Sequence, residues 1–182
     1  MTNRLQTVMN LKSQTHRVKL FEIVLLSFFG VLMFVSQVIM AALPNIEIVS
    51  LLIIIVTCVF GVKTLSSVYI FVICEALYYG IHDWVIGYLF AWPVLCLLVL
   101  ALRKFESKEL FTLVAGIFGL LFEIFFIIPY FIYGGFAYTV AKLINGFVFS
   151  IVHCIGNLVL TYLLYNPLKR ILEKSVKKQL KS

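Results

Sequence analysis

The sequence predicts an all-α integral membrane protein: a compact bundle of six transmembrane helices with both termini in the cytoplasm. Of its 182 residues, 63% are hydrophobic and only 13% are charged, which is more apolar than a soluble domain of this size needs for its core. All Lys and Arg residues except Lys142 lie in every second inter-helix segment. Basic residues near span ends stay on the cytoplasmic side of a membrane. The alternation therefore predicts an even number of membrane crossings, with the basic segments in the cytoplasm.

Each predicted span rests on apolar length, since a helix needs about 20 apolar residues to cross the hydrocarbon core and fewer where protein buries it. In chain order the spans are 20–43, 47–60, 65–81, 84–102, 110–133 and 140–165. Pro44-Asn45 follows the first span, Gly61 ends the second and Gly134-Gly135 ends the fifth. Asn166-Pro167 is expected to stop the sixth span.

These spans divide the chain into a cytoplasmic N-terminal tail (1–19), a six-helix membrane domain (20–166) and a basic cytoplasmic C-terminal tail (167–182). The amphipathic stretch 168–180 is expected to continue as a helix along the membrane surface. Short loops require neighbouring helices to pack side by side. Ala115 and Gly119, with Gly116 beside them, supply a small-residue face for close packing of the fifth span.

Several function classes are excluded by what the sequence lacks. The net charge of +7 comes from residues that flank apolar runs, so lipid headgroups explain it better than nucleic acid does. The four cysteines form no C-x-x-C pair, which supports neither a zinc site nor a disulfide framework. No Walker A, H-E-x-x-H or G-x-S-x-G motif is present. We therefore expect no enzyme activity, no cofactor and no metal, and no ATP hydrolysis by this chain alone.

Two carboxylates lie well inside predicted spans, away from the span ends: Glu75 in the third and Glu123 in the fifth. An ionisable group at the bilayer centre costs roughly 2.5–3.5 kcal/mol on insertion scales, so each is a candidate functional residue. Both spans run outward, which places both residues in the outer half, where they could reach a common chamber. The alternative is that each carboxylate only hydrogen-bonds a neighbouring helix.

Aromatic residues gather in the same outer halves. Trp84, Tyr88 and Trp92 recur at four-residue spacing and share one face of the fourth span. With Tyr79 and Tyr130 they suggest the wall of a pocket for a flat organic ligand. An interfacial aromatic belt is the alternative, and for Trp84 and Tyr138 it is the better one.

The sixth span carries a polar stripe at the same four-residue spacing, formed by Asn145, Phe149, His153 and Asn157. Asn145, near the outer end, could face a ligand. His153 and Asn157 lie deeper, where interhelical hydrogen bonding is the more common role.

The chain resembles the substrate-binding S components of energy-coupling factor (ECF) vitamin transporters. The residues that carry the resemblance are 42–47 after the first span, 75–80, 88–93 and 146–157. It implies a bacterial cell-membrane protein that binds a vitamin from outside, beneath the loop joining spans one and two. It further implies docking onto a transmembrane coupling protein with two cytoplasmic ATPase subunits. The Ala-x-x-x-Ala docking motif of many members is absent; Ser27 and Gly30 are the small residues available on the first span.

Within that family the Leu-Pro-Asn-Ile-Glu pattern is most like the members assigned to cobalamin, and riboflavin is the leading alternative. The scarcity of outer Lys and Arg disfavours a strongly anionic substrate. A proton-coupled carrier using Glu75 or Glu123 is the competing function. The residues expected to bind substrate are Asn45, Glu47, Glu75, Tyr79, Tyr88, Trp92, Glu123, Tyr130 and Asn145.

Overall fold

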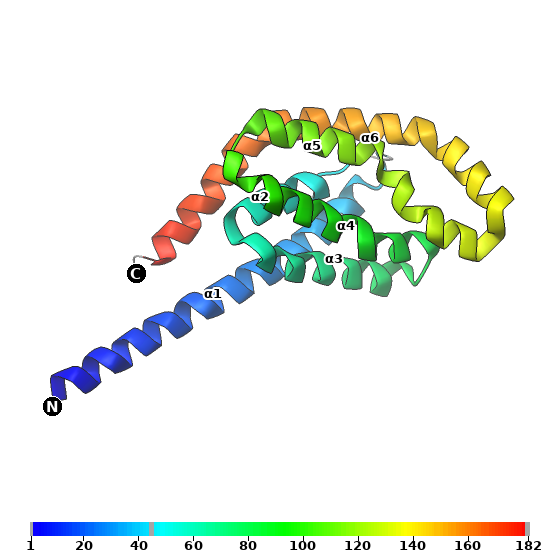
Figure 1. The fold of residues 1–182 in the computed structure, drawn as a ribbon. Helices are drawn as coiled ribbons and strands as arrows, with labels where there is room; N and C mark the ends of the chain where they lie inside the picture. The colour runs from blue at the N-terminus through cyan, green and yellow to red at the C-terminus, as the bar shows by residue number, and fades with distance from the viewer. Residues whose placement is uncertain (1, 44–45, 181–182) are drawn as a thin grey trace.

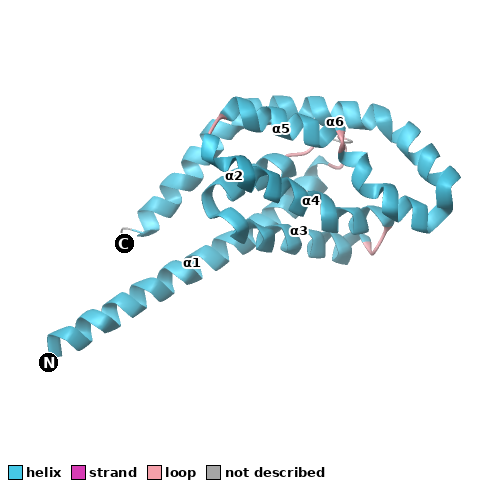
Figure 2. Cartoon of the chain, in the orientation of Figure 1, coloured by secondary structure: helices cyan, strands magenta, loops and turns pink. Residues whose placement is uncertain are grey.

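The computed structural model describes residues 2–43 and 46–180, which are mostly helical with short loops between the helices, and no strand occurs among them (Figure 2). The α-helices are α1 (Thr2–Met40), α2 (Val49–Phe60), α3 (Thr64–Tyr79), α4 (Asp83–Leu102), α5 (Lys108–Leu120) and α6 (Ile127–Leu180). Short 3₁₀ helices connect some of them: η1 (Gly61–Lys63), η2 (Arg103–Phe105) and η3 (Phe122–Phe126).

Four helical stretches are long and apolar enough to cross a membrane: Lys19–Met40, Val49–Tyr79, Asp83–Phe105 and Phe122–Gln179. Two of them change direction at a glycine with positive φ. Gly61 (φ 63°) separates α2 from α3, and Gly135 (φ 71°) interrupts α6. Glycine adopts this left-handed conformation without the steric penalty of a side chain. Gly135 is also where the sequence predicted the fifth span to end.

The predicted boundaries of the second to fourth spans agree with α2, α3 and α4 to within about two residues, which is the usual uncertainty of a helix end. The N–H groups of Gly61 and Gly80 bond back to the carbonyls of Thr57 and Ala76, closing α2 and α3. Ser107 begins α5, because its hydroxyl accepts the N–H of Leu110 at 3.1 Å.

Two expectations differ from the structure. The predicted span 110–133 is not one helix: α5 ends at Leu120, and η3 leads into α6. Pro167 does not stop the sixth span, because α6 continues through it to Leu180. A proline removes one backbone hydrogen bond but leaves the rest of the helix to continue. The N-terminal tail is also helical, since α1 begins at Thr2.

Close helix contacts occur where small residues meet. A Cβ placed on Gly30 of α1 would lie 2.7 Å from Ile70 of α3, and the Ser67 hydroxyl of α3 donates to the Leu26 carbonyl of α1 at 2.7 Å. A Cβ on Gly119 would lie 2.9 Å from the backbone of His153. The predicted small-residue face of the fifth span therefore packs against α6.

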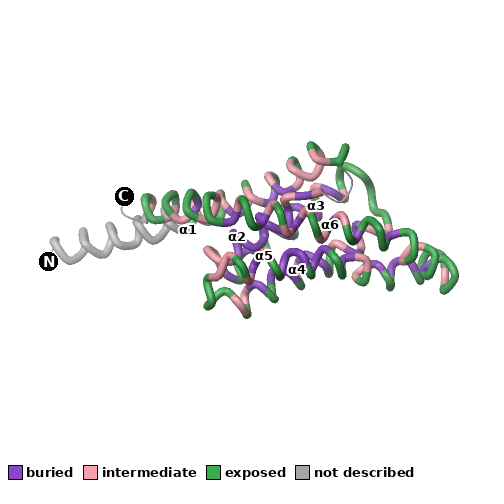
Figure 3. Tube along the Cα trace, turned by 90° about the horizontal axis from the view of Figure 1, so that it is seen from above, coloured by how far each residue is buried: buried purple, intermediate pink, exposed green. Residues whose placement is uncertain are grey.

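The buried residues gather in the middle of the bundle, where α2 is almost entirely enclosed by its neighbours (Figure 3). The N-terminal end of α1 and the C-terminal end of α6 lie toward the same end of the molecule (Figure 1). Since α1 and α3 run away from that end, residues 41–43 after α1 and the α3–α4 turn lie at the opposite one, which carries the candidate site.

Candidate ligand-binding site

A cavity of about 270 Å³ lies at the end of the bundle opposite the termini. Its walls come from the last turn of α1, the loop after it, the C-terminal half of α3, the N-terminal half of α4, η3 and α6. Five of the predicted ligand residues line it: Glu47, Glu75, Tyr79, Tyr88 and Trp92. These predicted residues on α3 and α4 thus share one cavity wall, and their contact with a ligand stays a prediction.

The aromatic wall is a continuous series of ring contacts along one face of α4. The ring centroids of Trp84 and Tyr88 are 5.2 Å apart, and those of Tyr88 and Trp92 are 5.3 Å apart. Phe122 of η3 closes the inner end, 5.2 Å from Trp92. The four-residue spacing thus forms a cavity wall as expected, and Trp84, for which a membrane belt was favoured, belongs to it as well.

A hydrogen bond from α1 holds this wall in place. The Gln37 side-chain amide donates to the Tyr88 hydroxyl at 2.9 Å, and both residues line the cavity. Tyr88 also stacks on Phe71 of α3 with centroids 5.9 Å apart. The central tyrosine is therefore fixed from two neighbouring helices, which gives the wall a defined shape before any ligand arrives.

Glu47 and His153 form the polar side of the cavity. The Glu47 carboxylate accepts the backbone N–H of Ser50 at 2.8 Å, which satisfies a donor in the first turn of α2. Its other oxygen lies 3.1 Å from Nε2 of His153 on α6. Phe122 packs edge-on against the His153 ring at 4.8 Å. His153 thus hydrogen-bonds a residue of the loop before α2, where a bond to a neighbouring helix was expected, and it also lines the cavity.

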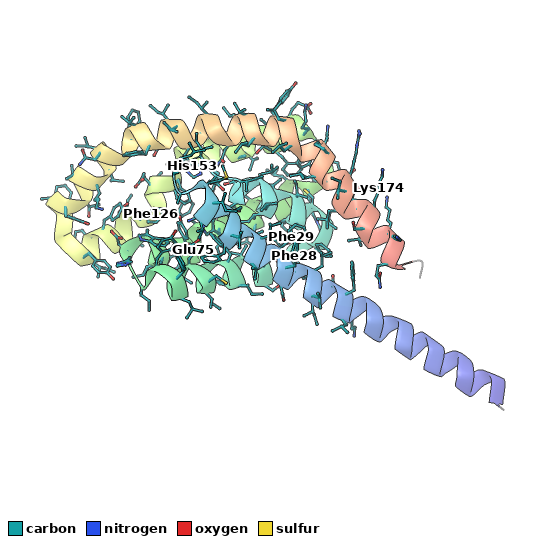
Figure 4. All side chains as sticks on the ribbon, turned by 180° about the vertical axis from the view of Figure 1, so that it is seen from behind. Phe28, Phe29, Glu75, Phe126, His153 and Lys174 are labelled. Carbon is teal, nitrogen blue, oxygen red and sulfur yellow. The ribbon has the colours of Figure 1, made fainter. Side chains whose placement is uncertain are left out.

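Glu75 is the exception among these polar residues. Its side chain is 0% exposed, yet neither carboxylate oxygen has a hydrogen-bond partner. The indole N–H of Trp92, 1% exposed, also lacks one. Buried polar groups in folded proteins are almost always paired, so unpaired groups facing a cavity call for an explanation. Figure 4 shows Glu75 on α3 and His153 on α6, on two sides of the interior.

The remaining predicted site residues lie elsewhere. Glu123 is not among the cavity-lining residues and instead accepts the Tyr130 hydroxyl at 3.1 Å. Tyr130 in turn lies beneath the Lys142 ammonium, 5.3 Å from its ring centroid. Asn145 is exposed, and Asn45 lies outside the described residues. Glu123 and Glu75 thus do not share this cavity, although a common chamber was expected for them.

Sequence reasoning missed several lining residues. Gln37, Met40 and Leu43 come from the end of the first span and the loop after it, where an apolar run gives no sign of facing a ligand. Phe122 was one of many phenylalanines in the fifth span. Only His153 carried a usable signal, because a histidine in an apolar helix needs a polar partner.

The site has binding features and no assembled nucleophile–base pair. No cluster of three or more metal-ligating side chains occurs among residues 19–43 and 46–179, whose side chains the structure describes. All four cysteines are free. The sequence matches no family profile, and no curated protein or solved structure is significantly similar to it.

Proposed function

We propose that this protein is the substrate-binding membrane subunit of an ATP-driven ECF-type vitamin importer. The observation that carries the proposal is the cavity lined by residues 41, 43, 46 and 47, with a fixed aromatic wall and a few converging polar groups, the usual make-up of a small-molecule site. It lies where the family resemblance expects substrate, at the end of spans one and three. The protein binds the vitamin and leaves ATP hydrolysis to partner subunits.

The size of the cavity bears on the choice of vitamin. Pockets for drug-sized ligands have volumes of about 300–1,000 Å³, and this one, about 270 Å³, lies at the lower limit. A vitamin of one or two rings suits that volume. Cobalamin, favoured by the Leu43–Glu47 pattern, is a far larger macrocycle than this cavity holds.

In the proposed membrane arrangement, the turns at Gly61 and Gly135 separate spans, so the chain crosses six times with both termini in the cytoplasm. The coupling protein and its two ATPases then meet the basic end of the bundle. Gly30 is not available to them, because it packs against α3. The exposed stripe of Val24, Phe28, Val31 and Val35 on α1, at helical spacing, is the surface left for docking.

Reconstitution tests this proposal. Vesicles containing the chain together with a coupling protein and its ATPases should accumulate a vitamin only when ATP is present inside. The chain alone should bind that vitamin without accumulating it. Protein purified from rich medium should carry the vitamin, visible by absorbance if it is a corrinoid or a flavin. Accumulation by the chain alone, without ATP, would contradict the proposed role.

One observation favours a second candidate function, a proton-coupled carrier. Glu75 is a buried, unpaired carboxylate facing a cavity, which is where a carrier could bind and release a proton. In that case vesicles without partner proteins should take up substrate when a pH gradient is applied, and Glu75→Gln should abolish this uptake. Under the importer proposal the gradient has no effect.

A further inference from the structure

We infer that the ligand of this cavity carries a cationic nitrogen and that the Glu75 carboxylate is its counter-ion. The inference rests on the proposed function only in taking the cavity to be a capture site. It specifies the chemistry of the ligand: a small molecule of one or two rings with a protonated amine or a cationic ring nitrogen.

The first argument is the unmatched charge. Both oxygens of Glu75 are buried without a partner, and a buried charge requires pairing to offset its loss of hydration. Among the described residues that line the cavity there is no Lys or Arg. The other lining carboxylate, Glu47, is already bonded to Ser50 and His153. Glu75 is therefore a lining carboxylate without a partner from the described part of the chain, and a cationic ligand would supply its counter-charge.

The second argument is the position of Glu75 relative to the aromatic wall. Phe71 lies one turn earlier on the same face of α3, and its ring is 5.9 Å from both Tyr88 and Trp92. The face of α3 that carries Glu75 is thus turned toward α4. A cation between this carboxylate and the rings of Trp84 and Tyr88 would gain from both, because aromatic faces attract cations, most strongly where water is excluded.

The third argument is that Lys142, the lysine on this side of the bundle, is held by other groups and does not pair with Glu75. Lys142, the outermost basic residue of the sequence, lies outside the cavity lining. Its ammonium is 3.9 Å from the Asp83 carboxylate and 5.3 Å from the rings of Tyr130 and Tyr138. It is therefore held beside the site by other groups, which leaves Glu75 without a cation from the chain.

Three probes of nearly equal size test the inference on the purified full-length chain. Benzylammonium carries the cation, benzyl alcohol replaces it with a neutral hydroxyl, and benzamide offers a neutral N–H donor. Trp84 and Trp92 are the only tryptophans and both line the cavity, so intrinsic fluorescence reports binding, and calorimetry checks the affinities. We expect benzylammonium to bind about tenfold or more tighter than either neutral probe.

Glu75→Gln is the decisive variant, because it keeps the size of the side chain and removes its charge. It should weaken benzylammonium about tenfold or more while leaving the neutral probes within about twofold. Glu109→Gln removes an exposed carboxylate outside the cavity and should change nothing. The melting temperature of Glu75→Gln should not fall, because no partner is lost, so weaker binding cannot be explained by misfolding.

Three outcomes overturn the inference: no preference for benzylammonium over the neutral probes, an equal loss of all probes in Glu75→Gln, or no response of either tryptophan to any probe. Stronger binding of benzamide than of benzylammonium would assign Glu75 to a neutral N–H donor and leave ligand capture intact. Failure of ATP-dependent accumulation with partner subunits contradicts the importer proposal but not the counter-ion assignment, so the two failures are distinguishable.

Discussion

The Glu47 carboxylate and the His153 imidazole meet at 3.1 Å although 106 residues separate them in the chain. Glu47 ends the loop after α1 and also bonds the first turn of α2, whereas His153 lies deep on α6. One side chain thus connects the segment before α2 to α2 and α6, and both it and His153 line the cavity.

The first prediction concerns this contact. Removing one partner of a buried pair leaves the other unsatisfied, which costs about 3–5 kcal/mol. We expect Glu47→Gln and His153→Ala each to lower the stability of the purified protein markedly, and the double variant to cost less than the sum of the two. Thermal unfolding of the four proteins measures this coupling.

The control for that cycle is the exposed ion pair between Lys63 and Glu22, with an N–O distance of 2.6 Å. Surface pairs contribute about 0–1 kcal/mol, so Glu22→Gln should hardly change the melting temperature. If Glu22→Gln lowered the melting temperature as much as Glu47→Gln does, the loss of stability in Glu47→Gln could not be attributed to the burial of its ion pair.

Helix positions could be predicted from apolar length and glycine signals, but the site could be predicted only in part. Span ends at Gly61 and Gly135 carry local information, since glycine adopts positive φ at low cost. The break between α5 and η3 has no such signal, because no glycine or proline lies within 121–126. Contacts of Phe122 with Trp92 and His153 hold that segment in place. Contacts between residues so far apart in the chain cannot be predicted from the local pattern of residue types.

The polar stripe of α6 shows a second limit. Residues four apart share a helix face only approximately, because each step turns about 40° beyond a full rotation. Three steps separate Asn157 from Asn145, so the two point about 120° apart. Asn157 is accordingly 2% exposed in the core, whereas Asn145 lies on the surface. The prediction of a shared helix face therefore holds for His153 and Asn157, which are four residues apart, and fails for Asn145 and Asn157, which are twelve apart.

The second prediction concerns Asn157, whose side-chain amide donates to the Ser50 hydroxyl and to the Ala115 carbonyl, both at 3.2 Å. It joins α6 to α2 and α5 in one polar contact. Asn157→Ala should destabilise by about 1–3 kcal/mol, because buried partners lose their hydrogen bonds. Asn166→Ala, an exposed site on the same helix, is the matched control and should cost little in the same unfolding measurement.

The third prediction compares two glycines of α5. A Cβ on Gly119 would meet the backbone of His153 at 2.9 Å, whereas a Cβ on Gly116 would meet the tip of the Leu158 side chain at 2.6 Å. A side-chain tip can rotate away but a backbone cannot. Gly119→Ala should therefore cost about 1–3 kcal/mol through overpacking, and Gly116→Ala less. Equal melting temperatures for the two variants would show that α5 and α6 separate freely.

The fourth prediction uses the two tryptophans, which differ in burial although both line the cavity. Trp92 is 1% exposed, and Trp84 is partly exposed near the opening. In the Trp84→Phe variant, which retains Trp92, the emission should lie at shorter wavelength and acrylamide should quench it weakly. In the Trp92→Phe variant, which retains Trp84, quenching should be stronger. A bound ligand should protect Trp84 most, since it stands at the entrance. Equal quenching of both without ligand would contradict the depth assigned to Trp92.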